Sequence, residues 1–350
     1  MHVGILTGGG DCPGLNAVIR AVTLSLVRQC GARVTGIERG FFGLVERRSR
    51  PLAPADVAHI LAEGGTILGT HNACDPFRWQ GADRSDDALA YARELGLDAL
   101  VVIGGDGTMS IAHRIGQRGL PVVSVPKTID NDLPATERTF GFDSAVAVVA
   151  EALDRVATTA RSHGRVMIVE TMGRYAGWIA LEGGMAGGAD AILLPELPFS
   201  VDAVAEFAKA READNGFTLI CIAEGAQAEG QGLVVRETIA SSPDPLRLGG
   251  VANWLQQQLQ PRLQSEVRST LLGHTQRGGT PTAFDRVLAT RFGWAAAELV
   301  REGRFGRMVV LKGDEIESVE IAGIAGRNRP VPVDHPLLRA ARDTGVMLGR

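Results

Sequence analysis

The sequence predicts an α/β protein built from two doubly wound, Rossmann-like domains, and three observations support this prediction. Short apolar runs typical of strands alternate with helical patterns along the chain, as expected for parallel sheets with right-handed crossovers. The 44 glycines fall in clusters directly after apolar runs, where a backbone can approach a ligand closely. The length of 350 residues favours two domains over one.

The first part of the chain contains four strand-like runs separated by helical patterns. The runs are short and rich in Val, Ile and Leu, which is typical of parallel strands buried on both faces. We expect strands at residues 2–6, 33–37, 99–103 and 122–125. We expect helices at residues 14–29, 55–63, 86–95 and 109–116. This alternation predicts the first parallel sheet.

A long helical pattern at residues 144–159 leads into a second series of strands and helices. We expect strands at residues 165–170, 192–194 and 218–223, and helices at residues 201–213 and 250–260. A further helix at residues 283–300 is expected to pack on the first domain. The predicted domains are therefore residues 1–140 with about 276–325, and residues 141–275 with about 326–350.

Composition and charge exclude several classes of protein. Hydrophobic residues make up 45% of the chain and charged residues 22%, as in a soluble globular protein. The formal net charge of −4 argues against general nucleic-acid binding, and no apolar run approaches the roughly 20 residues that span a bilayer. The first residues lack a signal-peptide pattern, and the cysteines lack metal-type spacing. We therefore expect a cytoplasmic protein with reduced thiols and no membrane or nucleic-acid partner.

The most informative segment is Pro126-Lys-Thr-Ile-Asp-Asn-Asp132, which follows the apolar run at residues 120–125. In open α/β sheets, ligands bind at the carboxyl ends of the strands. One carboxylate there can accept a proton from a substrate hydroxyl, a neighbouring one can serve magnesium, and Lys127 can neutralise phosphate. A polar loop with an ion pair is the alternative interpretation of this segment alone.

Two glycine-rich loops also follow strands. Residues 7–16 join the first strand to the first helix, and consecutive glycines let amide groups point at an anion beside the start of the helix. Residues 103–108 form a second such loop, in which Asp106 lies among glycines. Because a carboxylate repels phosphate unless a cation intervenes, Asp106 is a candidate magnesium ligand. A plain strand-to-helix turn is the alternative for each loop.

These three loops line up with a later set of motifs. The later set comprises Arg165, Met172-Gly-Arg174, Glu224, Arg268 and Gly273-His-Thr-Gln-Arg-Gly-Gly279. In this order and spacing they resemble the 6-phosphofructokinase family along nearly the whole chain. Within it, the chain resembles the bacterial phosphofructokinase A type and its actinobacterial group, whose members use ATP or diphosphate. The resemblance implies the phosphofructokinase fold.

The resemblance also implies transfer of a phosphoryl group from MgATP to the 1-hydroxyl of fructose 6-phosphate. Asp130 would take the proton of that hydroxyl, with Thr128 contacting the transferred group and Lys127 among the catalytic residues. Asp132 and Asp106 would organise magnesium and the attacking alcohol, Asp106 being the metal ligand. The residues that would hold the donor are Gly10, Gly105, Asp106, Gly107 and Thr108.

A sugar site and an oligomer follow from the same resemblance. Besides Thr128, Asp130 and Asp132, the implied sugar-site residues are Met172, Gly173, Arg174, Glu224, His274, Arg277, Arg165 and Arg268. Arg174 would stabilise charge in the transition state, Glu224 would accept hydrogen bonds from sugar hydroxyls, and His274 would bind the 6-phosphate together with Arg277. Several guanidinium groups suit a dianionic phosphate because each binds it bidentately. Since Arg165 and Arg268 would come from a neighbouring subunit, we expect at least a dimer, and a tetramer is the family norm.

Two positions bear on the phosphoryl donor. Gly107 has no side chain, which leaves room for the α-phosphate and adenosine, whereas the diphosphate-using branch resembles Gly-Gly-Asp-Asp there. Lys127 is usual in the diphosphate branch, and ATP-only enzymes often have Gly instead. This mixed pattern occurs in ATP-using members of the actinobacterial type. We therefore expect ATP, with diphosphate as the alternative donor.

The loop after residues 65–70 departs from the family pattern. An arginine that reaches the terminal phosphates of the donor is normal there, and this chain has Asn72. Losing such a cation typically costs a few kcal/mol of transition-state stabilisation. Arg78 would compensate if the loop at residues 73–79 folds back. Otherwise we expect slow turnover, or a preferred donor or acceptor that differs from the family norm.

Two alternatives to this activity stay open. The same arginines could hold sedoheptulose 7-phosphate as the acceptor. From another class, the chain could be a catalytically weak subunit that binds sugar phosphate, with Asn72 marking the loss of activity. The residues that argue for an enzyme are Asp106, Thr128, Asp130, Asp132 and Arg174. A protein that only binds has no need of a base.

Overall fold

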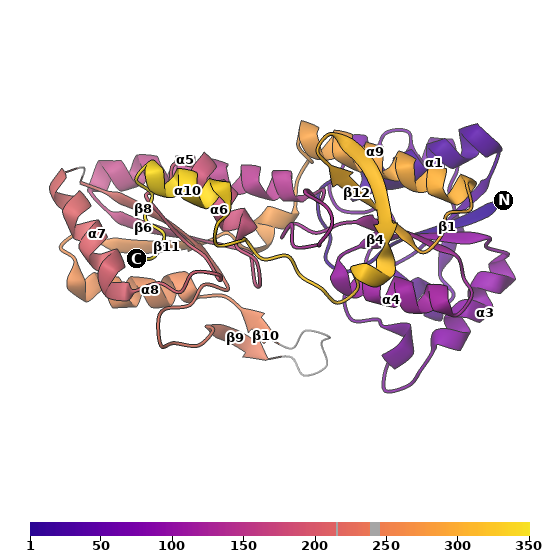
Figure 1. The fold of residues 1–350 in the computed structure, drawn as a ribbon, viewed down its shortest axis with the longest axis horizontal. Helices are drawn as coiled ribbons and strands as arrows, with labels where there is room; N and C mark the ends of the chain where they lie inside the picture. Colours follow the sequence, from indigo (N-terminus) through magenta and orange to yellow (C-terminus); the bar gives the residue numbers. More distant parts are fainter. Residues whose placement is uncertain (215, 239–245) are drawn as a thin grey trace. The chain divides into compact units, whose positions relative to one another are not determined.

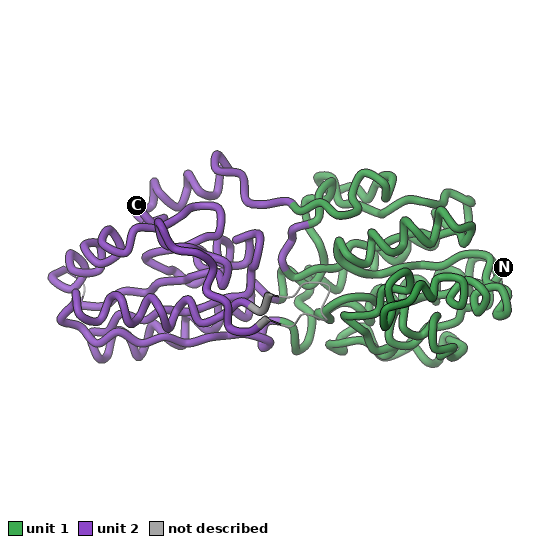
Figure 2. The backbone as a smooth tube through the Cα atoms, turned by 90° about the horizontal axis from the view of Figure 1, so that it is seen from below, with its two compact units in different colours: residues 1–129, 133–144, 277–328 green, residues 130–132, 145–276, 329–350 purple. Residues whose placement is uncertain are grey.

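The computed structural model describes residues 1–214, 216–238 and 246–350, and it divides the chain into two compact units. Unit 1 contains residues 1–129, 133–144 and 277–328, and unit 2 contains residues 130–132, 145–276 and 329–350 (Figure 2). Each unit has its own sheet flanked by helices (Figure 1). The predicted α/β class with two doubly wound domains is confirmed.

Unit 1 contains a seven-stranded sheet in the order β13-β12-β5-β4-β1-β2-β3. The strands are β1 (His2–Thr7), β2 (Arg33–Ile37), β3 (Ser49–Pro51), β4 (Ala99–Gly104), β5 (Val122–Pro126), β12 (Arg307–Lys312) and β13 (Glu315–Glu320). The five central strands are parallel, and β3 and β13 add antiparallel edges. All residues of β1, β4 and β5 are buried, because helices cover both faces of a parallel sheet.

The helices of unit 1 cover its sheet on two sides. They are α1 (Leu15–Cys30), α2 (Phe41–Val45), α3 (Ser85–Leu95), α4 (Asp106–Gln117) and α9 (Ala283–Arg301). Figure 1 shows α1 and α9 along one face of the sheet and α3 and α4 along the other. The backbones of α1 and α9 approach so closely that a Cβ on Gly293 would lie 2.7 Å from the Cβ of Ala21. Helix α9 therefore packs on the first sheet, as predicted.

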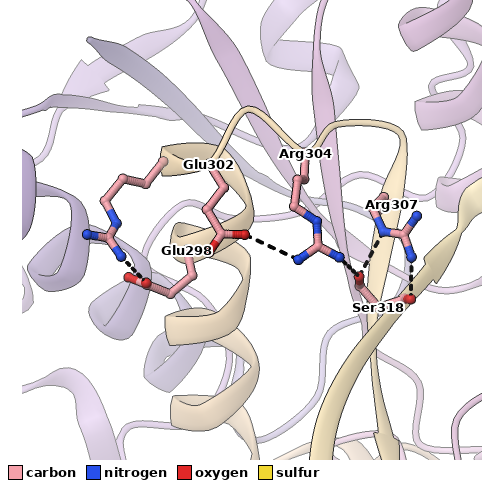
Figure 3. A network of polar contacts seen from close by, with 6 residues as sticks. Glu298, Glu302, Arg304, Arg307 and Ser318 are labelled. Atoms are coloured by element: carbon pink, nitrogen blue, oxygen red, sulfur yellow. Dashed lines mark hydrogen bonds and ion pairs between the residues drawn. The ribbon is translucent and has the colours of Figure 1, made fainter.

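The antiparallel edge of unit 1 is tied to the end of α9 by a polar network (Figure 3). Arg304 forms an ion pair with Glu302 at 3.2 Å and donates to the Ser318 hydroxyl at 3.3 Å. The guanidinium of Arg307 donates to the same hydroxyl at 2.8 Å. These groups are largely exposed, so the network contributes little to the stability of the fold.

Unit 2 contains a parallel four-stranded sheet in the order β11-β6-β8-β7 and a separate antiparallel pair. The strands are β6 (Val166–Thr171), β7 (Ala191–Leu193), β8 (Thr218–Ala223) and β11 (Val267–Leu271), and the pair is β9 (Val235–Thr238) with β10 (Leu246–Leu248). The helices are α5 (Phe142–His163), α6 (Trp178–Ala186), α7 (Val201–Asp214), α8 (Val251–Leu259) and α10 (Pro336–Asp343). In Figure 1, α5, α6 and α10 lie on one side of the sheet and α7 and α8 on the other.

One predicted element is wrong. Residues 55–63 were expected to form a helix, but the chain makes two 3₁₀ turns there, η1 (Pro54–Val57) and η2 (Ile60–Ala62). The Asn16 side-chain amide donates to the carbonyls of Glu63 and Gly64 at 3.2 and 3.3 Å, so these carbonyls face α1 instead of continuing a helix. No prediction was made for the short helices α2, α6 and α10 or for strands β3, β9, β10, β11, β12 and β13.

Two further expectations concern the whole chain. Cys12, Cys30, Cys74 and Cys221 are free thiols, in keeping with the expected reduced state. Within the described residues, no helix combines the length and apolar character needed to cross a bilayer. The assignment of donor binding and sugar binding to the two domains stays a prediction.

Candidate functional site

In unit 1 the two glycine-rich loops lie against each other. The amide of Gly8 donates to the carbonyl of Ile103 at 2.8 Å, which joins the end of β1 to the end of β4. A Cβ on Gly8 would lie 2.8 Å from the Thr108 side chain, so this contact requires glycine. Gly9 has a φ of 74°, a left-handed conformation that glycine adopts without strain. The loops therefore present closely packed backbone at the carboxyl ends of two adjacent parallel strands.

The second loop leads directly into α4. Gly105 precedes the helix and Asp106 is its first residue, with the amide of Met109 bonded to the carbonyl of Gly105 at 2.9 Å. The first amides of a helix have no intrahelical partner, and they attract anions together with the helix dipole. A Cβ on Gly107 would meet no atom within 4 Å, so the space beside it is open. A phosphate group would find amides here, with the Asp106 carboxylate at the same helix end.

Lys127 links the two loops. Its side chain is 3% exposed and its ammonium group donates to the carbonyl of Gly10. Its amide donates to the carbonyl of Gly104 at 2.9 Å, and a Cβ on Gly9 would lie 3.5 Å from its Nζ. The neighbouring Thr128 is fixed through its carbonyl, which accepts from the Thr139 hydroxyl at 2.7 Å. A cation is thus buried where both glycine loops converge.

Arg277 adds a second cation at the first loop. It ends the 3₁₀ turn η5 (Gly273–Arg277), and its Nη1 donates to the carbonyl of Asp11 at 3.1 Å. A Cβ on Gly10 would lie 2.8 Å from this nitrogen, so the guanidinium rests directly on the loop. Burial raises the pKa of the nearby Cys12 thiol to about 12, so it stays protonated near neutral pH despite Lys127 and Arg277. The structure therefore brings together residues expected to hold the donor and one expected to hold the sugar phosphate.

In unit 2, a second group of predicted residues gathers at the carboxyl ends of β6 and β8. The amide of Glu224 donates to the carbonyl of Thr171 at 2.9 Å, so the loops that follow the two strands run side by side. Gly173 has a φ of 129° and accepts from the amide of Gly225 at 3.2 Å. The side chain of Gln276 accepts from the amide of Met172 at 3.2 Å. Met172, Gly173 and Glu224 are therefore neighbours.

Four other predicted residues belong to unit 2. Arg174 lies 5.6 Å from the ring centroid of Tyr175, which is 50% exposed. His274 is exposed within η5, directly after the segment that follows β11. Asp130 and Asp132 are half-buried and flank Asn131, which is 2% exposed. Asn131 has a φ of 51°, an uncommon conformation for a residue other than glycine.

Arg165 and Arg268 do not join this group. Both form ion pairs with Glu266, whose side chain is 38% exposed. Arg165 immediately precedes β6, whereas Met172 immediately follows it, so the length of the strand separates them. At about 3.3 Å per residue, a six-residue strand spans roughly 20 Å. The two arginines therefore lie at the amino end of the unit 2 sheet, and Met172 and Glu224 lie at the carboxyl end.

The loop with the unexpected asparagine carries no positive charge at its start. His71 stacks on Phe42 at 5.1 Å, and its Nδ1 accepts from the amides of Ala73 and Cys74. Burial, followed by the charge of Arg39, lowers the pKa of His71, so the ring is neutral near pH 7. Asn72 is exposed, and so is Arg78 at the end of the 3₁₀ turn η3 (Pro76–Arg78). Compensation by Arg78 stays a prediction.

Sequence reasoning missed several residues that position the site. Gln276 lies inside the predicted motif at residues 273–279, but the motif did not indicate that its side chain is buried. Glu266 precedes β11 without any recognisable motif, and Arg329 belongs to a segment far from every glycine loop. Contacts of this kind join distant parts of the sequence, so no local pattern predicts them.

The chain resembles known proteins along most of its length. Residues 2–300 match the family model described as Phosphofructokinase. The chain is 49% identical to pyrophosphate–fructose 6-phosphate 1-phosphotransferase of Amycolatopsis methanolica, over 95% of this chain and 96% of the relative. It is 46% identical to ATP-dependent 6-phosphofructokinase 2 of Clostridium perfringens, over 98% and 97%. The solved phosphofructokinase of Pichia pastoris in the T-state is 33% identical with a TM-score of 0.81, over 93% of this chain and 37% of that one. The chain therefore belongs to the phosphofructokinase family.

Proposed function

We propose that this protein transfers the γ-phosphoryl group of MgATP to the 1-hydroxyl of fructose 6-phosphate, giving fructose 1,6-bisphosphate. The observation that carries this proposal is the convergence of two glycine loops on the buried Lys127, with Asp106 at the first position of α4. Backbone amides, a cation and a carboxylate are the groups that a metal-bound polyphosphate requires. Relatives named ATP-dependent 6-phosphofructokinase support the choice of donor and sugar.

Magnesium fits the residues around the second loop. Among residues 1–214, 216–238 and 246–350, no group of three or more His, Cys, Asp or Glu side chains could form a complete metal cage. Mg²⁺ bound with nucleotides needs only one or two carboxylates, since phosphates and water supply the other ligands. Asp106 would hold it, and Asp132 would help to organise the ion and the attacking alcohol. The bound ion would supply charge neutralisation at the donor phosphates.

The acceptor chemistry falls to the segment after β5 and to unit 2. Asp130 would take the proton from the sugar 1-hydroxyl, and Thr128 would contact the phosphoryl group in transit. Arg174 would stabilise the developing charge, and Glu224 would accept hydrogen bonds from the sugar hydroxyls. His274 and Arg277 would bind the 6-phosphate. We assign donor binding to unit 1 and sugar binding to unit 2.

The position of two arginines supports an oligomer. Because Arg165 and Arg268 lie at the amino end of the unit 2 sheet, they are remote from Met172 and Glu224 of their own chain. A neighbouring subunit that contributed its own pair would complete the site for the sugar phosphate. Strand β11 is the edge of its sheet, and Arg268 on this strand is exposed. We propose at least a dimer, with a tetramer as the family norm.

Diphosphate is the second candidate donor. Lys127 and the Amycolatopsis relative named as a pyrophosphate-dependent enzyme favour it. The open space beside Gly107 favours ATP, since an α-phosphate could pass there. Sedoheptulose 7-phosphate is a second candidate acceptor that the same arginines could hold.

The experiment is a matrix of each donor with each acceptor on the purified protein, in parallel with Asp130→Ala and Asp130→Ser. We expect ATP and fructose 6-phosphate to react, and both variants to lose on the order of 10²–10⁴-fold in kcat. Unchanged turnover in the variants would refute the role of Asp130. Calorimetric binding of sugar phosphate without turnover for any donor would instead support a binding subunit.

A further inference from the structure

The loop at residues 130–132 contains an uncommon backbone conformation that other contacts must stabilise. Asn131, between the two aspartates, combines a φ of 51° with a buried side chain. Residues other than glycine rarely adopt this conformation, and they persist in it only when surrounding contacts hold them there. The flanking residues Ile129 and Leu133 are both 0% exposed, which anchors the two ends of the loop. The direction of the Asp130 side chain depends on how the backbone between these anchors is fixed.

Arg329 fixes that backbone. Its guanidinium donates twice to the carbonyl of Asn131, from Nε at 3.2 Å and from Nη2 at 2.7 Å. Its own amide donates to the carbonyl of Asp132 at 2.6 Å. One residue therefore holds two successive carbonyls of the loop. A planar guanidinium can aim two N–H groups at one acceptor, whereas a lysine ammonium cannot reproduce this fork.

Arg329 is in turn held on its other side. Its guanidinium carbon lies 4.7 Å from the ring of Trp178, and the Trp178 indole donates to the Arg329 carbonyl at 3.0 Å. Two residues on, the amide of Val331 donates to Glu196 at 2.7 Å, and the same carboxylate oxygen accepts from the amide of Gly177 at 2.9 Å. Trp178 is 4% exposed, so this support is buried. The segment at residues 329–331 is thus fixed to the start of α6.

We propose that Arg329 is a positioning residue, which sets the direction of the Asp130 carboxylate by holding the carbonyls of Asn131 and Asp132. The inference rests on the proposed function, in which Asp130 is the base. A base must lie within hydrogen-bonding distance of the proton that it takes, so small displacements of its backbone reduce the rate. A misplacement of about 1 Å can cost on the order of 100-fold. The other proposed sugar-site residues lie outside this loop, so we expect kcat to fall by a larger factor than the KM of either substrate changes.

The test compares Arg329→Met with Arg329→Lys, and Arg339→Met serves as the matched control because Arg339 is an exposed arginine on α10. For Arg329→Met we expect kcat to fall on the order of 100-fold, with the KM of each substrate within about twofold of the original. Arg329→Lys keeps the charge and much of the side chain, and we expect a loss of about tenfold in kcat. Arg339→Met should retain full activity.

A double-variant cycle distinguishes positioning from general damage. If Arg329 acts through Asp130, adding Arg329→Met to Asp130→Ala should lower kcat by less than about threefold. A further loss as large as in the single variant would refute the inference, and so would a loss confined to KM. If Arg329→Met does not fold, Arg329→Lys decides, since full activity in that variant would also refute it. An original protein without turnover for any donor refutes the proposed function, whereas an active one with an unaffected Arg329→Met refutes only the positioning role.

Discussion

Substituting Gly107 with Asp tests the choice of donor directly. Gly107 is the second residue of α4 and has no positive φ, and a side chain there would enter open space. An acidic residue in the first turn of a helix is favoured by about 0.3–1 kcal/mol, and replacing glycine within a helix removes a penalty of up to about 1 kcal/mol. The variant should therefore fold with at least the stability of the original protein. Any loss of activity then reports on the site.

The expected size of the effect follows from charge repulsion. A carboxylate about 5 Å from an α-phosphate would be repelled by about 3 kcal/mol at an effective dielectric constant of about 20. Because Gly107 is exposed, water screens part of this repulsion, and we expect about 1.5–3 kcal/mol. This range corresponds to roughly 10- to 100-fold in kcat/KM for ATP. Diphosphate has no third phosphate to be repelled, so its use should change little.

The assay measures kcat/KM for ATP and for diphosphate separately, at saturating fructose 6-phosphate. Gly107→Asn is the matched control because its side chain has the same size without the charge, and we expect it to use ATP within about threefold of the original protein. A kcat/KM for ATP in Gly107→Asp that stays within twofold of the original protein would refute the role of charge repulsion. Equal losses in the Asp and Asn variants would show that size and not charge decides the donor.

Three further predictions concern metal, sugar binding and pH. Removing divalent cations with a chelator should abolish turnover, and added Mg²⁺ should restore it. Activity that persists in excess chelator would contradict the role of Asp106. Glu266→Gln should release Arg165 and Arg268 from their ion pairs and lower the KM for sugar phosphate by about two- to fivefold. The effect is small because exposed ion pairs are worth about 0–1 kcal/mol. A raised KM would show instead that Glu266 supports binding. Burial raises the pKa of Asp285 from 3.8 to about 6, so the native state binds its proton more tightly than the unfolded state. The associated stability is present below about pH 4 and falls by up to about 3 kcal/mol as the pH rises through 6. Asp285→Asn should flatten this slope in urea unfolding from pH 4 to 7, and an unchanged slope would contradict the assignment.

The sequence predicted the elements that are defined by local pattern. Strands β1, β4 and β8 are mostly apolar and are followed by glycine or polar residues. The local sequence therefore predicts both each strand and the turn that follows it. Strands β3 and β13 could not, because they are short or half-exposed edges without a clear alternation. The failed helix at residues 55–63 had helical composition, and contacts from α1 decided its conformation.

The candidate site shows the same division. Lys127 and the glycine loops lie at strand ends, and the parallel sheet brings strand ends together, so their convergence was predictable. The support from Arg329 to Asn131 joins residues 198 positions apart, and no spacing in the sequence indicates it. The pairing of Glu266 with two arginines was equally hidden, because a carboxylate before a strand is an ordinary surface feature.

The passage of the chain between the two units has a consequence for synthesis. The chain changes unit at residues 129/130, 132/133, 144/145, 276/277 and 328/329, so no single cut separates one unit from the other. Strand β5 pairs with β12, which the ribosome makes nearly two hundred residues later. When β5 has left the ribosome but β12 has not yet been made, one edge of β5 is unpaired. An exposed apolar edge strand of this kind is prone to aggregation with other chains. The growing polypeptide has to protect that edge, or a chaperone has to cover it, until the last third of the protein is made.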